Sequence, residues 1–383
     1  MLRIVTKSLG GVGRLSLLAA PLALMACVPE SRPSATTAQP SAPPAPAIVS
    51  IPVPPPAPRL VRAAPSPLSV AIEQAVRGFD GLAGVAVRAV DDGWTVEAGG
   101  RRPLPQQSVS KLWVALTLLE LRDQGRVRLD DPVTIRREDL TLFHQPIASL
   151  VRGPGYTTTV GDLLTRALTR SDNTANDRLL TLVGGPEAVR DVIANKRLGE
   201  IRFGPGERLL QAGTAGIEWR QEYSLGNAFS VARSRLDPAL RRAALDAYVG
   251  DPPDGASPLA IADALARLAR GELLSESSTR LMLETMERTV TGRARLRAAL
   301  PPGWTLGHKT GTGQDLGGRN AGFNDVGLLT APDGRRYAVA VLIGDTRRPI
   351  RERQSLIQAV ARAVALYGAS SPGGIVGAGV AAN

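Results

Sequence analysis

The chain has 383 residues, of which 43% are hydrophobic and 21% are charged, values typical of a globular protein with one or two domains. The net charge of +11 comes almost entirely from arginine, but the arginines are mixed with Asp and Glu and form no basic run. We therefore expect no nucleic-acid partner. The single cysteine, Cys27, excludes an intrachain disulfide, and the two histidines, His144 and His308, are far apart in sequence. This composition argues against a His/Cys metal site, and we expect no cofactor.

Residues 1–26 predict a lipoprotein-type signal peptide. Basic residues precede an apolar run from Leu15 to Ala26, which is too short to span a bilayer as a permanent helix. The run ends at Leu24-Met25-Ala26-Cys27, which resembles the site where bacterial lipoproteins are cleaved and lipidated on the cysteine. We expect export to the periplasmic face of the cell envelope and membrane anchoring through Cys27. A plain signal peptide with an incidental cysteine is the alternative.

Two further segments have compositions that cannot build a core. Residues 27–67 are dense in Pro, Ala and Ser and predict an extended spacer between the anchor and the domain. Residues 369–383 are rich in Gly and Ala and predict a disordered tail. The folded domain is therefore expected to span residues 68–368.

Within that span, strand patterns occur near both ends and helical patterns lie between them. A helix is expected at 68–79, followed by strands at 84–90 and 95–98 around the turn Asp91-Asp92-Gly93. Helical patterns follow at 108–125, 160–168, 175–182, 187–195, 239–248, 258–270 and 277–286. Strands are expected at 305–309, 325–330 and 337–343, and a closing helix at 350–366. The order predicts an α+β fold, an α/β sandwich plus an all-α lobe. Its antiparallel sheet comes from both ends of the domain (about 68–100 and 300–368), and the helical lobe (about 101–299) is inserted between them.

The first chemical motif is Ser108-Val109-Ser110-Lys111, at the start of a predicted helix. Residues three apart share a helix face, so the amine of Lys111 is expected beside the hydroxyl of Ser108. A serine hydroxyl becomes a useful nucleophile when a base lies next to it. A helix amino terminus also offers free N–H groups for an oxyanion. On its own, the motif is better explained as a serine cap followed by a surface lysine.

Two more motifs follow, Ser171-Asp172-Asn173 between two helices and Lys309-Thr310-Gly311 at the end of a strand. Taken alone, Ser171-Asp172-Asn173 fits a capping turn, and Lys309-Thr310-Gly311 fits the end of a strand that runs into a loop. Lysine and threonine offer donors for a carboxylate, and the glycine lets a substrate lie close to the strand. The chain has only four lysines, and two of them, Lys111 and Lys309, fall inside these motifs.

The three motifs, in this order, resemble those of the serine β-lactamase and penicillin-binding protein superfamily, and especially its class A β-lactamases. The similarity covers about residues 68–368. It extends to Thr174, Ala175 and Asn176, the turn Gly184-Gly185-Pro186, the helix start Ser257-Pro258, and Asn324-Asp325.

The resemblance implies a role for each motif residue in acylation. Ser108 would attack the lactam carbonyl, with Lys111 assisting proton transfer. Ser171 would pass a proton to the leaving nitrogen. The backbone N–H groups of Ser108 and Thr312 would form the oxyanion hole.

The resemblance also implies contacts that hold the substrate. Asn173 would contact its side-chain amide, while Lys309 and Thr310, next to Gly311, would anchor its carboxylate. Arg319, in the Gly-rich stretch after the third motif, is a further candidate for that carboxylate, although an arginine in such a loop is commonly only solvated.

A class A β-lactamase also needs a glutamate that activates water to release the acyl group, usually within Glu-x-x-Leu-Asn. At the equivalent distance this chain has Glu207-Arg208-Leu209-Leu210-Gln211, with glutamine in place of asparagine. Glutamine offers the same amide donors and acceptor, so Gln211 is expected to help hold the water. Glu218 and Glu222 are rival candidates for the base.

From about Ala212 to Gly255 the chain is longer than the corresponding loop of the family and is expected to add at least one helix at the site mouth.

The expected function is hydrolysis of β-lactams by acylation of Ser108 and deacylation through Glu207. The alternatives are a DD-peptidase or transpeptidase acting on cell-wall peptides, which lacks the deacylating glutamate, and a catalytically silent envelope lipoprotein. The intact nucleophile and lysines argue against the silent lipoprotein, and a generic esterase would leave the Lys-Thr-Gly motif unexplained. A monomer acting on a β-lactam or a cell-wall peptide is expected.

Overall fold

The computed structural model describes residues 63–368. The predicted signal peptide, Cys27, most of the predicted spacer and the predicted tail lie outside the described residues. The first helix, α1, spans Ser66–Arg77 and so begins inside the last residues of the expected spacer.

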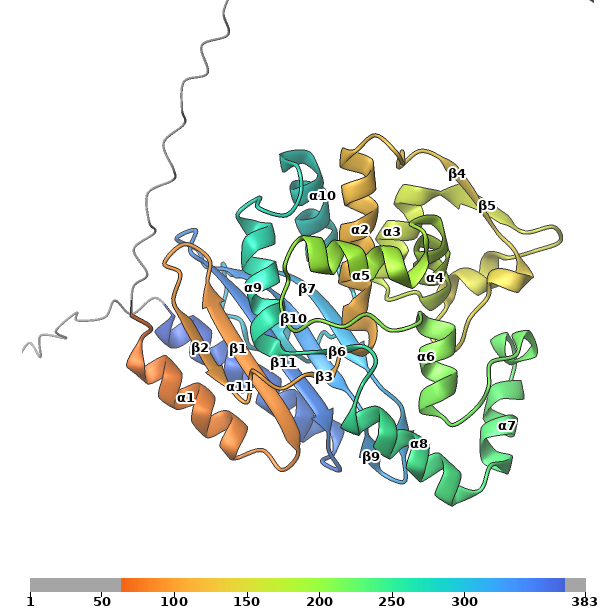
Figure 1. The fold of residues 1–383 in the computed structure, drawn as a ribbon. Coiled ribbons are helices and arrows are strands. Elements are labelled where there is room, and N and C mark those ends of the chain that lie inside the picture. The colour runs from red at the N-terminus through yellow and green to blue at the C-terminus, as the bar shows by residue number, and fades with distance from the viewer. Residues whose placement is uncertain (1–62, 369–383) are drawn as a thin grey trace, which may run out of the picture. The chain divides into compact units, whose positions relative to one another are not determined.

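The centre of the fold is a five-stranded antiparallel sheet with the order β2-β1-β11-β10-β7. Its strands are β1 (Leu82–Ala89), β2 (Thr95–Ala98), β7 (Thr305–Thr312), β10 (Phe323–Thr330) and β11 (Arg336–Asp345). Val87 of β1 pairs with Val339 of β11, so strands from the two ends of the domain lie side by side (Figure 1). The expected α+β class, with a sheet built from both ends, is confirmed.

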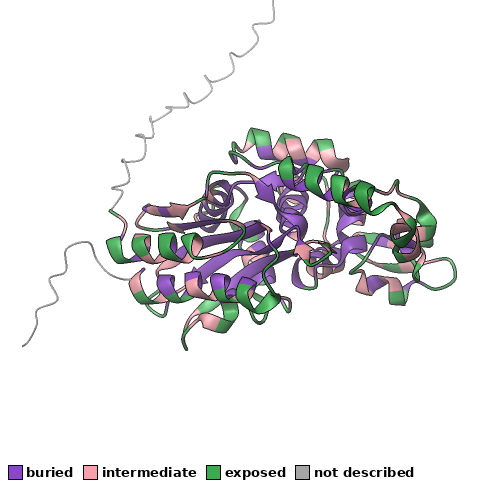
Figure 2. Ribbon diagram, turned by 90° about the horizontal axis from the view of Figure 1, so that it is seen from below, coloured by how far each residue is buried: buried purple, intermediate pink, exposed green. Residues whose placement is uncertain are grey.

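Helices cover both faces of this sheet. The helices α1 and α11 (Ile350–Tyr367) lie on one face, and α9 (Pro258–Ala269) lies on the other (Figure 1). Side chains alternate along each strand, so Val85 and Val87 pack towards α1 and α11 while Ala86 belongs to the core on the α9 side. Figure 2 shows buried residues along the sheet and exposed residues on the outer sides of its helices.

The helical lobe is built around α2 (Lys111–Asp123), in which every residue from Lys111 to Leu119 is buried. The short 3₁₀ turn Gln107–Ser110 precedes it. The surrounding helices are α3 (Val160–Thr169), α4 (Asn173–Leu182), α5 (Gly185–Asn195) and α10 (Glu276–Glu287). All of these helices were expected, to within a few residues at their ends.

The segment from Glu207 to Gly250 holds three helices, α6 (Glu207–Thr214), α7 (Ala228–Arg235) and α8 (Pro238–Gly250). The last two lie in the predicted insert, where at least one helix was expected. The remaining short strands are β3 (Leu104–Pro105), β4 (Pro132–Ile135), β5 (Tyr156–Thr159), β6 (Gly255–Ala256), β8 (Asp315–Leu316) and β9 (Arg319–Asn320). Further 3₁₀ turns occur at Arg137–Asp139, Pro146–Leu150, Gln221–Ser224 and Leu296–Ala299.

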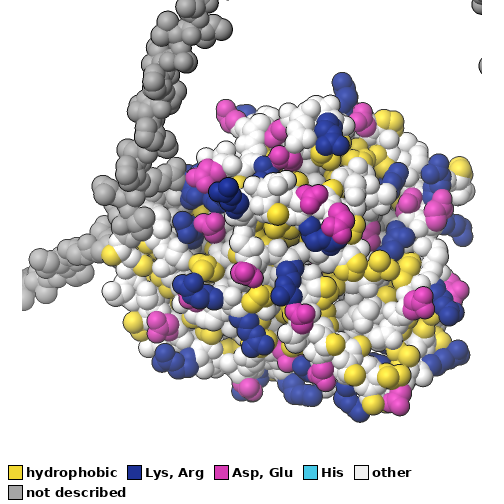
Figure 3. Space-filling view, in the orientation of Figure 1, with side chains coloured by type: hydrophobic (Ala, Val, Ile, Leu, Met, Phe, Trp, Pro, Cys, Tyr) yellow, Lys and Arg dark blue, Asp and Glu magenta, His cyan; other side chains and the backbone are white. Residues whose placement is uncertain are grey.

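Basic and acidic side chains alternate over the face shown in Figure 3, as the sequence pattern indicated. Between residues 63 and 368, none of the helices combines the length and the apolar character needed to cross a bilayer.

The packing of α11 on the sheet leads to a stability prediction. Ile357 is fully buried in the core between the sheet and this helix, whereas Leu366 of the same helix is 66% exposed. We expect Ile357→Ala to lower the free energy of unfolding by about 2–5 kcal/mol, because it leaves a cavity. Leu366→Ala should change it by no more than about 0.5 kcal/mol. Denaturant unfolding of both variants measures the difference, and equal effects would contradict the packing described here.

Candidate active site

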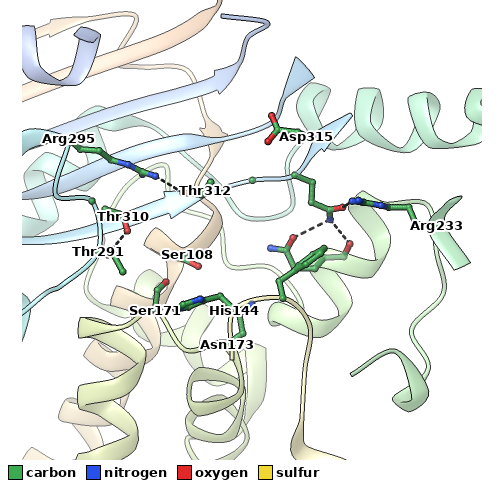
Figure 4. A pocket seen from close by; sticks show the side chains of 15 residues that line it. Ser108, His144, Ser171, Asn173, Arg233, Thr291, Arg295, Thr310, Thr312 and Asp315 are labelled. Atoms are coloured by element: carbon green, nitrogen blue, oxygen red, sulfur yellow. Dashed lines mark hydrogen bonds between the residues drawn. The ribbon is translucent and has the colours of Figure 1, made fainter. Parts of the chain in front are cut away.

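A cavity of about 570 Å³ lies where β7 meets the helical lobe and the insert. It brings together residues from all three motifs (Figure 4). Its lining includes Ser108, Ser171, Asn173, Gln211, Thr310 and Thr312.

Ser108 and Lys111 adopt the relationship that their spacing predicted. The ammonium Nζ of Lys111 donates to the hydroxyl Oγ of Ser108 at 2.7 Å. It also donates to Oδ1 of Asn173 at 2.9 Å and to a carboxylate oxygen of Glu207. Lys111 is 1% exposed, so these contacts replace the water that a charged amine would otherwise need.

Glu207 is the first residue of α6, and its position is fixed by a buried carboxylate beneath it. Asp177 accepts hydrogen bonds from the backbone N–H groups of Glu207 (2.9 Å) and Arg208 (3.1 Å), which are free at the helix start. Burial raises the pKa of Asp177, and the neighbouring charge of Glu207 raises it further. Of the three candidate bases, Glu207 is buried beside Lys111, while Glu218 and Glu222 are exposed.

Gln211 lies one turn after Glu207 and contacts three parts of the site. Its amide nitrogen Nε2 is 3.4 Å from Oε2 of Glu207 and 2.9 Å from Oε1 of Gln107. Gln314, which follows β7, donates to the backbone oxygen of Gln211 at 2.8 Å. Gln211, the residue that departs from the family pattern, therefore links α6, the residue before Ser108, and the segment that follows β7.

Ser171 and Lys309 form the second pair of motif residues. Lys309 is completely buried, and its Nζ donates to Oγ of Ser171 at 2.8 Å and to the backbone oxygen of Thr310 at 2.9 Å. Burial lowers the pKa of Lys309 well below its ordinary value, and repulsion from the charge of Lys111 adds to the effect. Ser171 has a left-handed backbone (φ +58°), which is uncommon for serine, and its hydroxyl lines the cavity.

The end of β7 presents hydroxyl groups backed by a buried arginine. Arg295 donates to Oγ1 of Thr312 at 2.6 Å and to the backbone oxygen of Gly311 at 2.9 Å. Its guanidinium carbon lies 3.8 Å from the ring centroid of Phe323. Burial lowers the pKa of Arg295 to about 10. A Cβ atom on Gly311 would lie 2.3 Å from the backbone oxygen of Gln106, so only glycine fits there.

Arg319 is not at the pocket, and its expected role in carboxylate binding is corrected. Its guanidinium is held by both carboxylate oxygens of Asp345, at 2.7 and 2.9 Å, and by Asp246. These ion pairs occupy its donors, and it does not line the cavity. The arginines in the lining are Arg295 and Arg233.

Neither of these arginines carried a signal in the sequence. Arg295 lies 14 positions before Lys309 in an arginine-rich chain, and Arg233 lies in the insert, so neither belongs to a motif. Among residues 63–368, the structure shows no cluster of three or more His, Cys, Asp or Glu side chains that could hold a metal ion.

A buried polar cluster that sequence reasoning also missed supports the residue before the nucleophile. Gln107 has φ +53°, and its backbone N–H donates to Oδ2 of Asp254 at 2.7 Å. The hydroxyl of Tyr248, on α8 of the insert, lies 3.2 Å from the same oxygen and accepts from Nε2 of Gln107. Burial raises the pKa of Asp254 to about 7, although these hydrogen bonds oppose the shift. The insert thus reaches the backbone next to Ser108 through Tyr248.

Asp254 gives the fold a pH dependence that can be measured. Its pKa in the folded protein lies above its ordinary 3.8, so the folded state is stabilised relative to the unfolded state where Asp254 stays protonated. This stabilisation is fully present below about pH 4 and is lost as pH rises through 7. The loss amounts to up to about 4 kcal/mol. Asp254→Asn keeps an acceptor but does not titrate. We expect its free energy of unfolding, relative to the parent, to improve by up to that amount between pH 4 and pH 7.5. Parallel pH profiles for the two proteins in denaturant unfolding would contradict the assignment.

Comparison with known proteins gives consistent matches over this domain. A family model described as the beta-lactamase enzyme family matches residues 67–367. The chain is 30% identical over 292 residues to the extended-spectrum β-lactamase PER-1 of Pseudomonas aeruginosa, covering 76% of this chain and 84% of that protein. The crystal structure of a β-lactamase from Chitinophaga pinensis superposes with a TM-score of 0.65 at 26% identity, covering 78% of this chain and 98% of that one. An ancestral class A β-lactamase gives a TM-score of 0.61 at 28% identity, covering 78% and 98% of the two chains.

The motifs, the fold and these matches agree over the same residues. The chain belongs to the β-lactamase enzyme family, as a divergent class A member.

Proposed function

We propose that this protein hydrolyses the amide bond of β-lactams through an acyl-enzyme on Ser108. The observation that carries the proposal is the contact of Glu207 with Lys111, whose Nζ is 2.7 Å from Oγ of Ser108. A nucleophile, its proton acceptor and a carboxylate are thereby joined by direct contacts. This arrangement supports both halves of the reaction.

In acylation, Oγ of Ser108 attacks the lactam carbonyl carbon, and its proton passes to the Lys111–Glu207 pair. The ring C–N bond breaks, and the leaving nitrogen takes a proton from the hydroxyl of Ser171. Ser171 regains a proton from the Lys111–Glu207 pair, which leaves Glu207 as a free carboxylate for the next step. Lys309 lies 2.8 Å from that hydroxyl and stabilises the oxygen as the proton leaves. The N–H groups of Ser108 and Thr312 stabilise the negative charge on the carbonyl oxygen.

In deacylation, Glu207 takes a proton from a water molecule, whose oxygen attacks the ester carbonyl. The C–O bond to Ser108 breaks, and Oγ regains the proton that Glu207 took from the water, passed on through Lys111. Gln211, one turn along α6, offers its amide to the same water. Asp177 supports this step because it holds the two backbone N–H groups at the start of α6.

Substrate binding uses the end of β7 and the start of α4. Thr310 and Thr312 provide hydroxyl donors for a carboxylate, with Lys309 behind Thr310, and Arg295 behind Thr312 provides positive charge. Asn173 lies at the opposite wall. Its Oδ1 accepts from Lys111 and one N–H of its Nδ2 donates to the backbone oxygen of Leu142, so the second N–H is the donor for the substrate amide.

Two substitutions separate these steps in a chromogenic cephalosporin assay. Ser108→Ala removes the nucleophile, so turnover should fall by at least about 10³-fold. Glu207→Gln keeps acylation but removes the base for water, so kcat should fall by about 10²–10⁴-fold after a burst of one equivalent. Glu218→Gln serves as the matched control, because Glu218 is exposed.

A stable acyl-enzyme already in the parent would favour a penicillin-binding peptidase, and absence of acylation in the parent would exclude both functions.

We also propose that the mature protein is anchored to a membrane by lipid on Cys27, which lies outside the described residues. The sequence Leu24-Met25-Ala26-Cys27 supports this proposal. We expect the full chain to fractionate with membranes in a bacterial host and Cys27→Ala to be released in soluble form. Equal membrane fractions for both proteins would refute the anchor, and the mass of the mature amino-terminal peptide provides an independent check.

A further inference from the structure

Arg233 contributes a positive charge to the pocket from outside the family motifs. It lies on α7 in the insert, and its side chain lines the cavity (Figure 4). Gln211 and Gln314 line the same cavity. Nη1 of Arg233 donates to Oε1 of Gln314 at 2.9 Å. Within the described part of the chain, no ion pair involves Arg233. Asp315, the carboxylate that also lines the cavity, pairs instead with Arg353 at 3.6 Å.

The guanidinium of Arg233 therefore keeps unused donors in a partly desolvated place. Arginine carries five N–H donors, and the contact with Gln314 uses one of its nitrogens. Burial and the neighbouring charge of Arg241 lower the pKa of Arg233. By contrast, hydrogen bonds to Asp345 and Asp246 raise the pKa of Arg319. Arg233 is a half-buried cation whose charge the surrounding side chains do not neutralise.

The pocket thus has two cationic ends with the nucleophile between them. Arg295 stands behind the threonines of β7 at one end, Arg233 stands beside Gln314 at the other, and Ser108 lies between them in the view of Figure 4. Consider a β-lactam whose ring carboxylate lies at the β7 end and whose carbonyl lies at Ser108. Its acyl side chain then occupies the other end of the pocket. That end is the one that Arg233 lines.

Aromatic rings lie next to this second cation. Phe143, which lines the cavity and is 47% exposed, packs edge-on against Phe229 with ring centroids 5.3 Å apart. The guanidinium carbon of Arg233 is 5.9 Å from the ring centroid of Phe229. An apolar surface beside a cation suits an aryl or alkyl group that carries a negative charge.

We propose that Arg233 determines specificity by binding a second anionic group, carried on the acyl side chain of the substrate. This inference rests on the β-lactamase function proposed above. It follows from the position of Arg233 in the pocket, its free donors, and the separate carboxylate-binding end at β7. β-Lactams with two negative charges are therefore favoured over matched β-lactams with one.

The test uses benzylpenicillin and its α-carboxy derivative, carbenicillin, which differ by a single side-chain carboxylate. We expect Arg233→Gln to lower kcat/KM for carbenicillin at least about tenfold more than for benzylpenicillin, mainly through KM, because a charge-assisted hydrogen bond is lost. Arg233→Lys keeps the charge but not the planar fork, and should recover part of the difference.

Arg242→Gln is the matched control for net charge. Arg242 lies on α8 of the same insert, is exposed, does not line the cavity, and should affect both penicillins equally. An equal effect of Arg233→Gln on the two penicillins would overturn the inference while leaving the β-lactamase function intact. If the parent opens neither penicillin, the β-lactamase function itself fails and the inference falls with it.

If Arg233→Gln does not fold, the inference is tested on the parent alone, by measuring how its activity on the two penicillins depends on salt. Its preference for carbenicillin must decline as ionic strength rises, and a preference that does not depend on salt would overturn the inference.

Discussion

The site depends on one buried charge, the ammonium group of Lys111. A charged amine at 1% exposure is tolerated only where its donors are satisfied and its charge is balanced. Ser108, Asn173 and Glu207 supply those partners from the turn before α2, the start of α4 and the start of α6. The same contacts that make burial of Lys111 possible bring the nucleophile and the proposed base together. Stability of the helical lobe and chemistry at Ser108 therefore rest on the same atoms.

The edge strand β7 joins this group to the rest of the fold. It lies at the end of the sheet order, and its Lys309 reaches Ser171 in the helical lobe. The close approach of Gly311 to the backbone of Gln106 lets β7 pack against the segment that carries Ser108. The insert reaches the site from the other side, through Tyr248 and through Arg233, which donates to Gln314. The pocket is thus enclosed by the sheet, the helical lobe and the insert.

Much of this arrangement could be predicted from the sequence, because it depends on local spacing. The i, i+3 relation of Ser108 and Lys111, the turn between α3 and α4, and the hairpin around Asp91-Asp92-Gly93 are all local features. Glu207 was found by its distance along the chain, and the structure places it in contact with Lys111. The motif lysines were informative because lysine is rare in this chain.

The residues that were missed take their roles from long-range contacts. Arg295 is one of many arginines and is distinguished only by its burial behind Thr312. Arg319 was selected by sequence proximity to the third motif, but Asp345 of β11 and Asp246 of α8 hold it away from the pocket. Asp254 and Tyr248 carry no motif, and the chain must fold before they meet Gln107.

The most direct test of the central claim is the mass of the intact protein during reaction with benzylpenicillin. Glu207 is proposed to release the acyl group that Ser108 accepts. Glu207→Gln should therefore accumulate a species heavier by one penicillin, while the parent returns to its free mass within the time of substrate consumption. Rapid release of the acyl group by Glu207→Gln at the parent's rate would contradict the assignment of Glu207 as the base.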